Sequence, residues 1–187
     1  MAAGNGRRWQ TTPMPQLASA VVARPVTSAA VRHAELRARQ EAYPGHLLRR
    51  AQQVLTIAWA EDVSASVTSS QFVILNVLRA APGIDQRTLG EVVCMDRSTV
   101  AAIVARLTTD GLIRQSRHPL DKRRKVLATT TKGARLAADL EPRAQQMSER
   151  LLALLETGEQ REQFMNQFRS LVHRWEDSRA TSRNQER

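Results

Sequence analysis

Residues 85–133 read DQRTLGEVVCMDRSTVAAIVARLTTDGLIRQSRHPLDKRRKVLATTTKG, and this stretch decides the fold. The apolar pattern predicts two short helices, at residues 85–93 and 97–109. It then predicts a β-hairpin whose strands are residues 112–117 and 124–130. Asp96 is well suited to cap the second helix, and Gly111 is well suited to end it. A helix pair followed by a basic hairpin suits duplex DNA, with one helix in the major groove and the hairpin beside it.

Basic residues are concentrated on this same stretch. The chain has 28 Lys and Arg residues against 18 Asp and Glu, which gives a formal net charge of +10. Between Arg87 and Lys132 there are ten basic residues and only four acidic ones. Such an excess predicts attraction to a polyanion, either a nucleic acid or an acidic membrane surface. Because the excess lies on the helix pair and the hairpin, a DNA-binding regulator is the leading hypothesis.

Length and cysteine content limit the class of protein. The 187 residues are enough for one domain with a substantial core. Cys94 is the only cysteine, which excludes an intrachain disulfide and favours a reducing compartment. No apolar run approaches the roughly 18 residues of a membrane helix. Pro13 and Pro15 interrupt the early stretch that could otherwise serve as an export signal. We therefore expect a cytoplasmic protein with no membrane partner.

The periodicity of apolar residues predicts the domain organisation. We expect a partly disordered N-terminal extension (residues 1–43), a main domain (44–177) and a polar tail (178–187). Within the main domain we expect a winged helix-turn-helix at about residues 68–132, flanked by helical segments at about 46–64 and 131–176. Pro142 predicts a kink or a break in the long C-terminal helix. The flanking helices carry more apolar surface than one small winged domain needs. A two-fold homodimer on a palindromic operator would bury that surplus.

The ordered motifs resemble the MarR family of bacterial winged helix-turn-helix regulators over about residues 44–175. The resemblance is carried by Asp96-Arg97-Ser98-Thr99-Val100, Arg106-Leu107, Gly111-Leu112-Ile113, Pro119-x-Asp121-x-Arg123 and Thr130-x-x-Gly133. It implies a fold that is mainly α with a small β wing, and with N- and C-terminal dimerisation helices. It also implies a transcriptional regulator that is not an enzyme and that uses no cofactor.

The resemblance implies roles on the reading helix. Ser98 and Thr99 would contact base edges or phosphates from the start of this helix. Arg97 and Arg106 would make phosphate or base contacts. Ala102, with Ala101, departs from the many members that carry a polar or basic residue here. A methyl group at this position suits contact with thymine methyls.

The wing carries the second set of predicted DNA contacts. By resemblance, Arg123 would probe the minor groove, where a narrow A·T-rich stretch attracts a guanidinium. Asp121 would hold the wing in shape. Lys122 and Arg124 belong to the same basic run, and we predict that they also contact DNA.

The segment at residues 44–53 is similar to the first helix of members that respond to aromatic carboxylates. In those members an Arg of this pair reaches the ligand carboxylate, which a guanidinium binds as a bidentate fork. The similarity points to Arg49, with His46 as a second donor and Trp59 as a wall of the cleft. Alternatively, Arg49 and Arg50 form salt bridges across the dimer. The predicted function is a repressor released from its operator by a small aromatic carboxylic acid.

Other classes of function leave fewer marks in the sequence. No nucleotide-binding or nucleophile motif and no acid–base pair supports an enzyme. No histidine pair has the spacing of a metal site, so we expect no metal. A sequence-neutral architectural DNA-binding protein stays open because of the high charge and the paired alanines. A redox-responsive regulator that uses Cys94 is a further alternative, although we expect Cys94 to be a small buried apolar residue.

Overall fold

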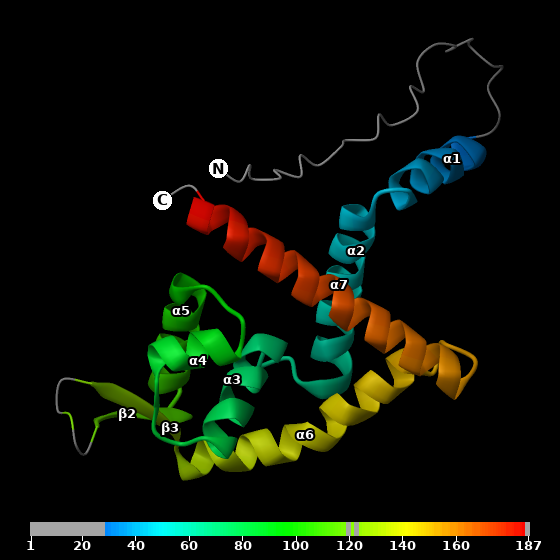
Figure 1. Cartoon of the computed structure of the whole chain (residues 1–187). Coiled ribbons are helices and arrows are strands. Elements are labelled where there is room, and N and C mark those ends of the chain that lie inside the picture. Colours follow the sequence, from blue (N-terminus) through cyan, green and yellow to red (C-terminus); the bar gives the residue numbers. More distant parts are fainter. Residues whose placement is uncertain (1–28, 119–120, 122–123, 186–187) are drawn as a thin grey trace, which may run out of the picture. The chain divides into compact units, whose positions relative to one another are not determined.

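A computed structural model of the chain describes residues 29–118, 121 and 124–185 (Figure 1). The chain divides into two units, residues 1–47 and residues 48–187. In the first unit the described part comprises helix α1 (Ala29–Glu41) and the first turn of α2 (Pro44–Ala58). The disorder predicted for the N-terminal extension concerns residues 1–28 above all, and these lie outside the described residues.

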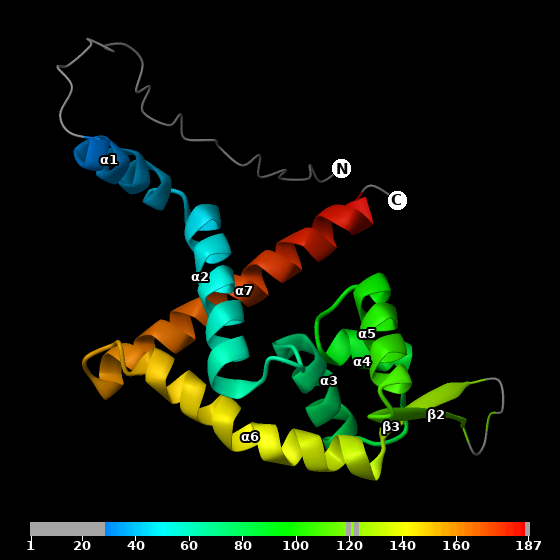
Figure 2. The ribbon, with the colours of Figure 1, turned by 180° about the vertical axis from the view of Figure 1, so that it is seen from behind.

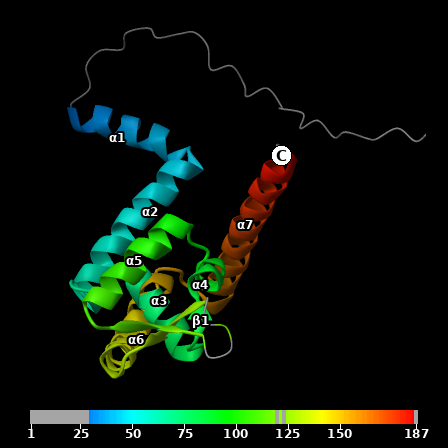
Figure 3. The same ribbon diagram turned by 90° about the vertical axis from the view of Figure 1, so that its left-hand side faces the viewer.

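The second unit contains the predicted combination of helices and a small antiparallel sheet, so the predicted fold class is confirmed. After α2 come a π-helical turn (Trp59–Val63), α3 (Ser69–Ala80), β1 (Ile84–Asp85), α4 (Gln86–Val92), α5 (Arg97–Thr109), β2 (Ile113–Arg117), β3 (Lys125–Thr129), α6 (Thr131–Leu152) and α7 (Gly158–Gln185). The sheet order is β1-β3-β2. Figure 3 shows β1 beside the hairpin and next to α4.

Side-chain caps explain where four of these helices begin. Thr68 and Gln71 form a capping box at the start of α3. Asp85 accepts the N–H of Thr88 at the start of α4. Asp96 caps α5, and Thr130 caps α6 by accepting a later N–H. Each cap satisfies a backbone donor that the first turn of a helix leaves without a partner.

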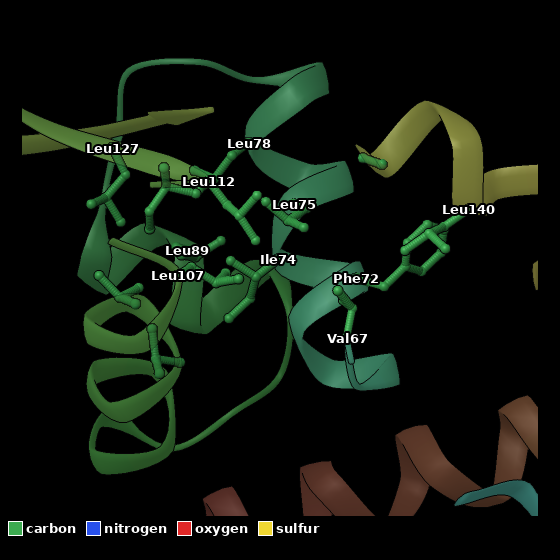
Figure 4. Packing of buried hydrophobic residues seen from close by; sticks show 14 of the residues in the cluster. Val67, Phe72, Ile74, Leu75, Leu78, Leu89, Leu107, Leu112, Leu127 and Leu140 are labelled. Carbon is green, nitrogen blue, oxygen red and sulfur yellow. The ribbon is translucent and has the colours of Figure 1, made fainter. Parts of the chain in front are cut away.

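One apolar cluster joins α3, α4, α5 and the sheet (Figure 4). Its most deeply buried large members are Ile74, Leu75, Leu78, Leu89, Val100, Val104, Leu107 and Leu127. Phe72, Leu140 and Trp59 extend the cluster toward α6 and the π-helical turn. The core therefore fixes α5 and the hairpin on a common support.

Three local features differ from the sequence predictions. Val92 lies three residues after the buried Leu89, a spacing that predicts burial, yet Val92 is 57% exposed and the neighbouring Val93 packs on the cluster instead. Residues 84–85 lie between two predicted helices, where the sequence indicates only a short link, yet they form a strand, with Ile84 paired to Leu127 and Asp85 to Val126. Helix α6 continues through Pro142 to Leu152, so the proline does not split it. Figure 2 shows that the ribbon of α6 bends along its length.

The T-x-x-G motif forms a tight junction between α6 and the turn that precedes β2. Gly111 has a φ of +70°, which ends α5 and redirects the chain. The Thr130 hydroxyl donates to the Gly111 carbonyl at 2.7 Å and accepts the Gly133 N–H at 3.1 Å. The Thr130 N–H donates to the Leu112 carbonyl at 2.9 Å. A Cβ on Gly133 would lie 1.9 Å from that same carbonyl oxygen. The motif therefore requires a residue without a side chain.

Gly133→Ala should destabilise the fold because the atoms that the added methyl meets belong to the Leu112 backbone and cannot rotate away. We expect the free energy of unfolding to fall by about 1–3 kcal/mol or more. Gly158→Ala is the matched control, since a Cβ there has no atom within 4 Å. Urea unfolding at one protein concentration measures both variants. Equal midpoints for the two would contradict the close approach.

Candidate nucleic-acid interface

The start of α5 is organised by the carboxylate of Asp96. Its Oδ1 accepts the backbone N–H groups of Ser98 and Thr99 at 3.0 and 2.9 Å. The hydroxyl of Ser98 also donates to Oδ1, and the hydroxyl of Thr99 donates to Oδ2 at 2.6 Å. The two hydroxyls, followed by the backbone N–H of Thr99, hold the pKa of Asp96 well below its ordinary value. Asp96 is therefore charged at neutral pH.

This arrangement limits what Ser98 and Thr99 can do chemically. Both are exposed, but each hydroxyl proton is already donated to Asp96. A hydroxyl in this state keeps its lone pairs and acts as an acceptor. Phosphate oxygens are acceptors too, whereas the amino groups of adenine and cytosine are donors in the major groove. The geometry thus favours contact between these hydroxyls and base amino groups over contact with phosphates.

The exposed face of α5 carries two arginines and two methyl groups. Arg97, Ala101, Ala102 and Arg106 are all exposed. The Nε of Arg106 donates to Asp110 Oδ2 at 3.0 Å, one turn along the helix. Among the described residues, Arg97 has no ion-pair partner. Arg97 is therefore the cation of α5 with its full charge available to a ligand.

The hairpin places further cations next to its turn. Arg117 pairs with Lys125 in the register of β2 and β3, and both are exposed. Asp121 takes part in the turn between the strands, where its carbonyl accepts the Arg124 N–H at 3.0 Å and its N–H donates to His118 Nδ1 at 3.3 Å. Both contacts are made by the backbone of Asp121, and the supporting role of its side chain stays a prediction. The predicted contacts Lys122 and Arg123 lie outside the described residues.

Arg124 was predicted to be a DNA contact, and the structure also gives it a partner within the chain. Its Nη2 donates to Asp85 Oδ2. The N–H of Thr88, followed by the Arg124 guanidinium, lowers the pKa of Asp85 from 3.8 to about 2. The sequence did not indicate this pair, because the two residues are 39 positions apart.

Cys94 is exposed, so the expectation that it is buried was wrong. It lies in the turn between α4 and α5, and its φ of +53° is rare for a residue other than glycine. Cys94 therefore belongs to the apolar face of neither helix. Its thiol lies 3.7 Å from the Glu91 carbonyl oxygen.

The residues considered for an effector lie in different surroundings. Arg49 is exposed on α2 and has no ion pair within the described part of the chain. Trp59 is 7% exposed; its indole N–H donates to the Val67 carbonyl at 2.6 Å, and its ring contacts Phe72. His46 is half-buried and belongs to the first unit.

The described residues contain no group of three or more His, Cys, Asp or Glu side chains that could hold a metal ion. None of their helices combines the length and the apolar character that spanning a membrane requires.

Comparison with known proteins gives consistent results. The sequence pattern described as the MarR family matches residues 67–125. The transcriptional regulator HosA of Escherichia coli O111:H- is 30% identical over 128 residues, which cover 68% of this chain and 93% of HosA. The PcaV transcriptional regulator from Streptomyces coelicolor, solved with its natural ligand, is 41% identical with a TM-score of 0.67. That match covers 70% of this chain and 92% of PcaV.

A third match connects a relative to both DNA and an aromatic acid. BpsR of Bordetella bronchiseptica is 26% identical with a TM-score of 0.65, over 70% of this chain and 93% of BpsR. Its structure concerns the regulation of DNA binding by 6-hydroxynicotinic acid.

The lowered pKa of Asp85 predicts a pH dependence of stability. Because the folded-state pKa of about 2 lies below the ordinary 3.8, the charged form stabilises the fold. This contribution is complete above pH 3.8 and is lost as the pH falls through about 2. We expect Asp85→Asn to make the decline in unfolding free energy over that window shallower. Asp139→Asn, which changes an exposed carboxylate on α6, is the control and should leave the wild-type slope. Chemical denaturation at a series of pH values measures this, and equal slopes for Asp85→Asn and wild type would contradict it.

Proposed function

This chain belongs to the MarR family of transcriptional regulators, and from that premise we propose that it is a homodimeric repressor released from a palindromic operator by a small aromatic carboxylic acid. HosA and PcaV are named transcriptional regulators, and the chain is accordingly not an enzyme. The proposal goes beyond family membership in three respects: repression rather than activation, the homodimer, and the chemical class of the effector.

One observation carries the DNA-binding part of the proposal. The exposed start of α5 combines Arg97 with two acceptor hydroxyls, and the same core supports the basic hairpin beside it. A helix of this width fits the major groove, while a basic hairpin can reach the neighbouring minor groove. In the proposed complex, Arg97 and Arg106 contact phosphates or bases, Ser98 and Thr99 accept from base amino groups, and Ala102 meets thymine methyls. Lys122 and Arg123 belong to the wing's contribution.

Exposed apolar side chains support the homodimer. One described face of α7 leaves five large apolar residues half exposed: Phe164, Phe168, Leu171, Val172 and Trp175. On α2, Leu48, Val54 and Ile57 are exposed as well. Contiguous apolar surface of this kind is unfavourable in water and is relieved by association of two copies. A two-fold dimer presents two reading helices to a palindromic site.

The effector class rests on Arg49 and on the relatives. An exposed guanidinium with no ion-pair partner among the described residues is available for a carboxylate, which it binds through two parallel hydrogen bonds. BpsR is regulated by 6-hydroxynicotinic acid, an aromatic acid of the proposed kind. The proposed mechanism is a shift of population. A ligand that binds better to a dimer with an unsuitable spacing of its reading helices lowers the affinity for DNA.

Arg97→Ala should weaken binding to the operator and reduce its dependence on salt. Loss of one phosphate contact lowers the slope of log K against log salt by about 0.9. Arg143→Ala removes the same charge from α6 and is the control. Mobility-shift titrations on DNA that flanks the gene, at several salt concentrations and against random competitor DNA, measure both. Wild-type binding no tighter than binding to random DNA would favour the architectural alternative.

Arg49→Ala should leave operator affinity nearly unchanged while it abolishes release by the effector. Loss of the bidentate partner removes the charge that recognises the carboxylate. Arg50→Ala is the matched control at the neighbouring position and should still respond. A panel of hydroxylated benzoic and nicotinic acids, added to the preformed complex, supplies the probes. If Arg49→Ala instead dissociates the dimer, the salt-bridge interpretation is supported.

A further inference from the structure

We infer that Asp85 and Arg124 form a latch that fixes the wing on the start of α4, so that Arg124 positions the wing rather than contacting DNA. This inference rests on the proposed function, because it concerns how the wing and α5 engage DNA together. It gives Arg124 a different role from the one that the sequence predicted. It also gives Asp85 a role in recognition.

Asp85 is held by three separate elements. Its backbone belongs to β1, where it is paired with Val126 of β3. Its Oδ1 accepts the N–H of Thr88 at 2.9 Å and the Thr88 hydroxyl at 3.1 Å, at the start of α4. Its Oδ2 accepts from Arg124. The side chain is only 19% exposed, so the carboxylate has little freedom to choose another partner.

Arg124 is held at both its backbone and its side chain. Its N–H donates to the Asp121 carbonyl at 3.0 Å, and its carbonyl accepts the N–H of His118 at 2.9 Å. These two bonds close the turn between β2 and β3. The guanidinium then reaches across to Asp85. One residue therefore ties the closed turn of the wing to the N-terminus of α4.

The latch connects the two parts of the interface. Helix α4 packs against α5 through the core around Leu89 and Val100, while Arg124 lies in the turn of the wing, immediately before β3. The wing and α5 must enter neighbouring grooves at the same time, so the angle between them decides the fit. A carboxylate–guanidinium pair is directional and resists rotation of one part against the other.

The alternative is that Arg124 leaves Asp85 and neutralises a phosphate. That exchange leaves a half-buried carboxylate without its cation, which is unfavourable. The two roles predict opposite effects of Asp85→Asn. Asparagine still caps a helix, but it cannot hold the guanidinium as an ion pair. If Arg124 contacts a phosphate, Asp85→Asn releases it and strengthens binding.

The experiment compares Asp85→Asn, Arg124→Met and the double variant on two DNA duplexes. One is the operator, and the other has the A·T pairs under the wing replaced by G·C pairs. A latch predicts that each single variant loses most of the preference for the operator flank, by about fivefold or more. The double variant should lose no more than either single one. The salt slope of Arg124→Met should stay at the wild-type value, whereas a phosphate contact lowers it by about 0.9.

Arg79 and Glu141 supply the matched control. They form a 2.6 Å ion pair between α3 and α6, away from the wing. Arg79→Met should keep the preference for the operator flank, and a loss equal to that of Arg124→Met would overturn the specific role of the latch. Binding by Asp85→Asn that is tighter than wild type would also overturn it.

A readout without DNA separates this inference from the proposed function. Hydrogen exchange of the Arg124 amide should be faster in Asp85→Asn than in wild type, because the turn is no longer anchored. Unchanged exchange would overturn the latch even if the operator is bound. Faster exchange in a protein whose wild type shows no operator preference would retain the anchoring but refute the proposed function.

Discussion

The close approach of α6 to the backbone of Leu112 is the constraint on which the other contacts of the domain depend. Gly133 lies where any side chain would collide with the Leu112 carbonyl, and Thr130 bonds to the same turn. Gly111 then sends the chain from the end of α5 into β2. The reading helix, the hairpin and the long helix α6 thus meet within a few residues. A displacement of α6 at this junction would shift the other two elements as well.

The interface itself depends on how Asp96 uses its hydrogen bonds. This carboxylate accepts both hydroxyls and two backbone N–H groups at the start of α5. A helix N-terminus commonly attracts phosphate through such N–H groups. Here those of Ser98 and Thr99 are already occupied by a negative charge. In the proposed complex, the start of α5 therefore relies on Arg97 for attraction to DNA and on the acceptor oxygens of Ser98 and Thr99 for discrimination between bases.

The sequence was sufficient to predict an element wherever the residues that determine its start and end are close together in the chain. Helix α5 begins after Asp96 and ends before Gly111, because a cap and a left-handed residue act locally. The short strand β1 and its Asp85 pairing could not be predicted in this way, since both require β3 to be in place. Cys94 was misassigned because its exposure follows from a left-handed turn, which no apolar period reveals.

Charge alone cannot make the DNA binding of this protein sequence-specific. A net charge of +10 raises the affinity for every duplex equally, and salt weakens that attraction. Between Thr99 and Arg106, the exposed face of α5 offers methyl groups at Ala101 and Ala102, which make no hydrogen bonds with bases. In the proposed complex, specificity therefore also depends on the simultaneous fit of α5 in the major groove and of the wing in the neighbouring minor groove. That requirement makes the fixed geometry between wing and helix as important as any single contact, and Asp85 lies at the point where that geometry is set.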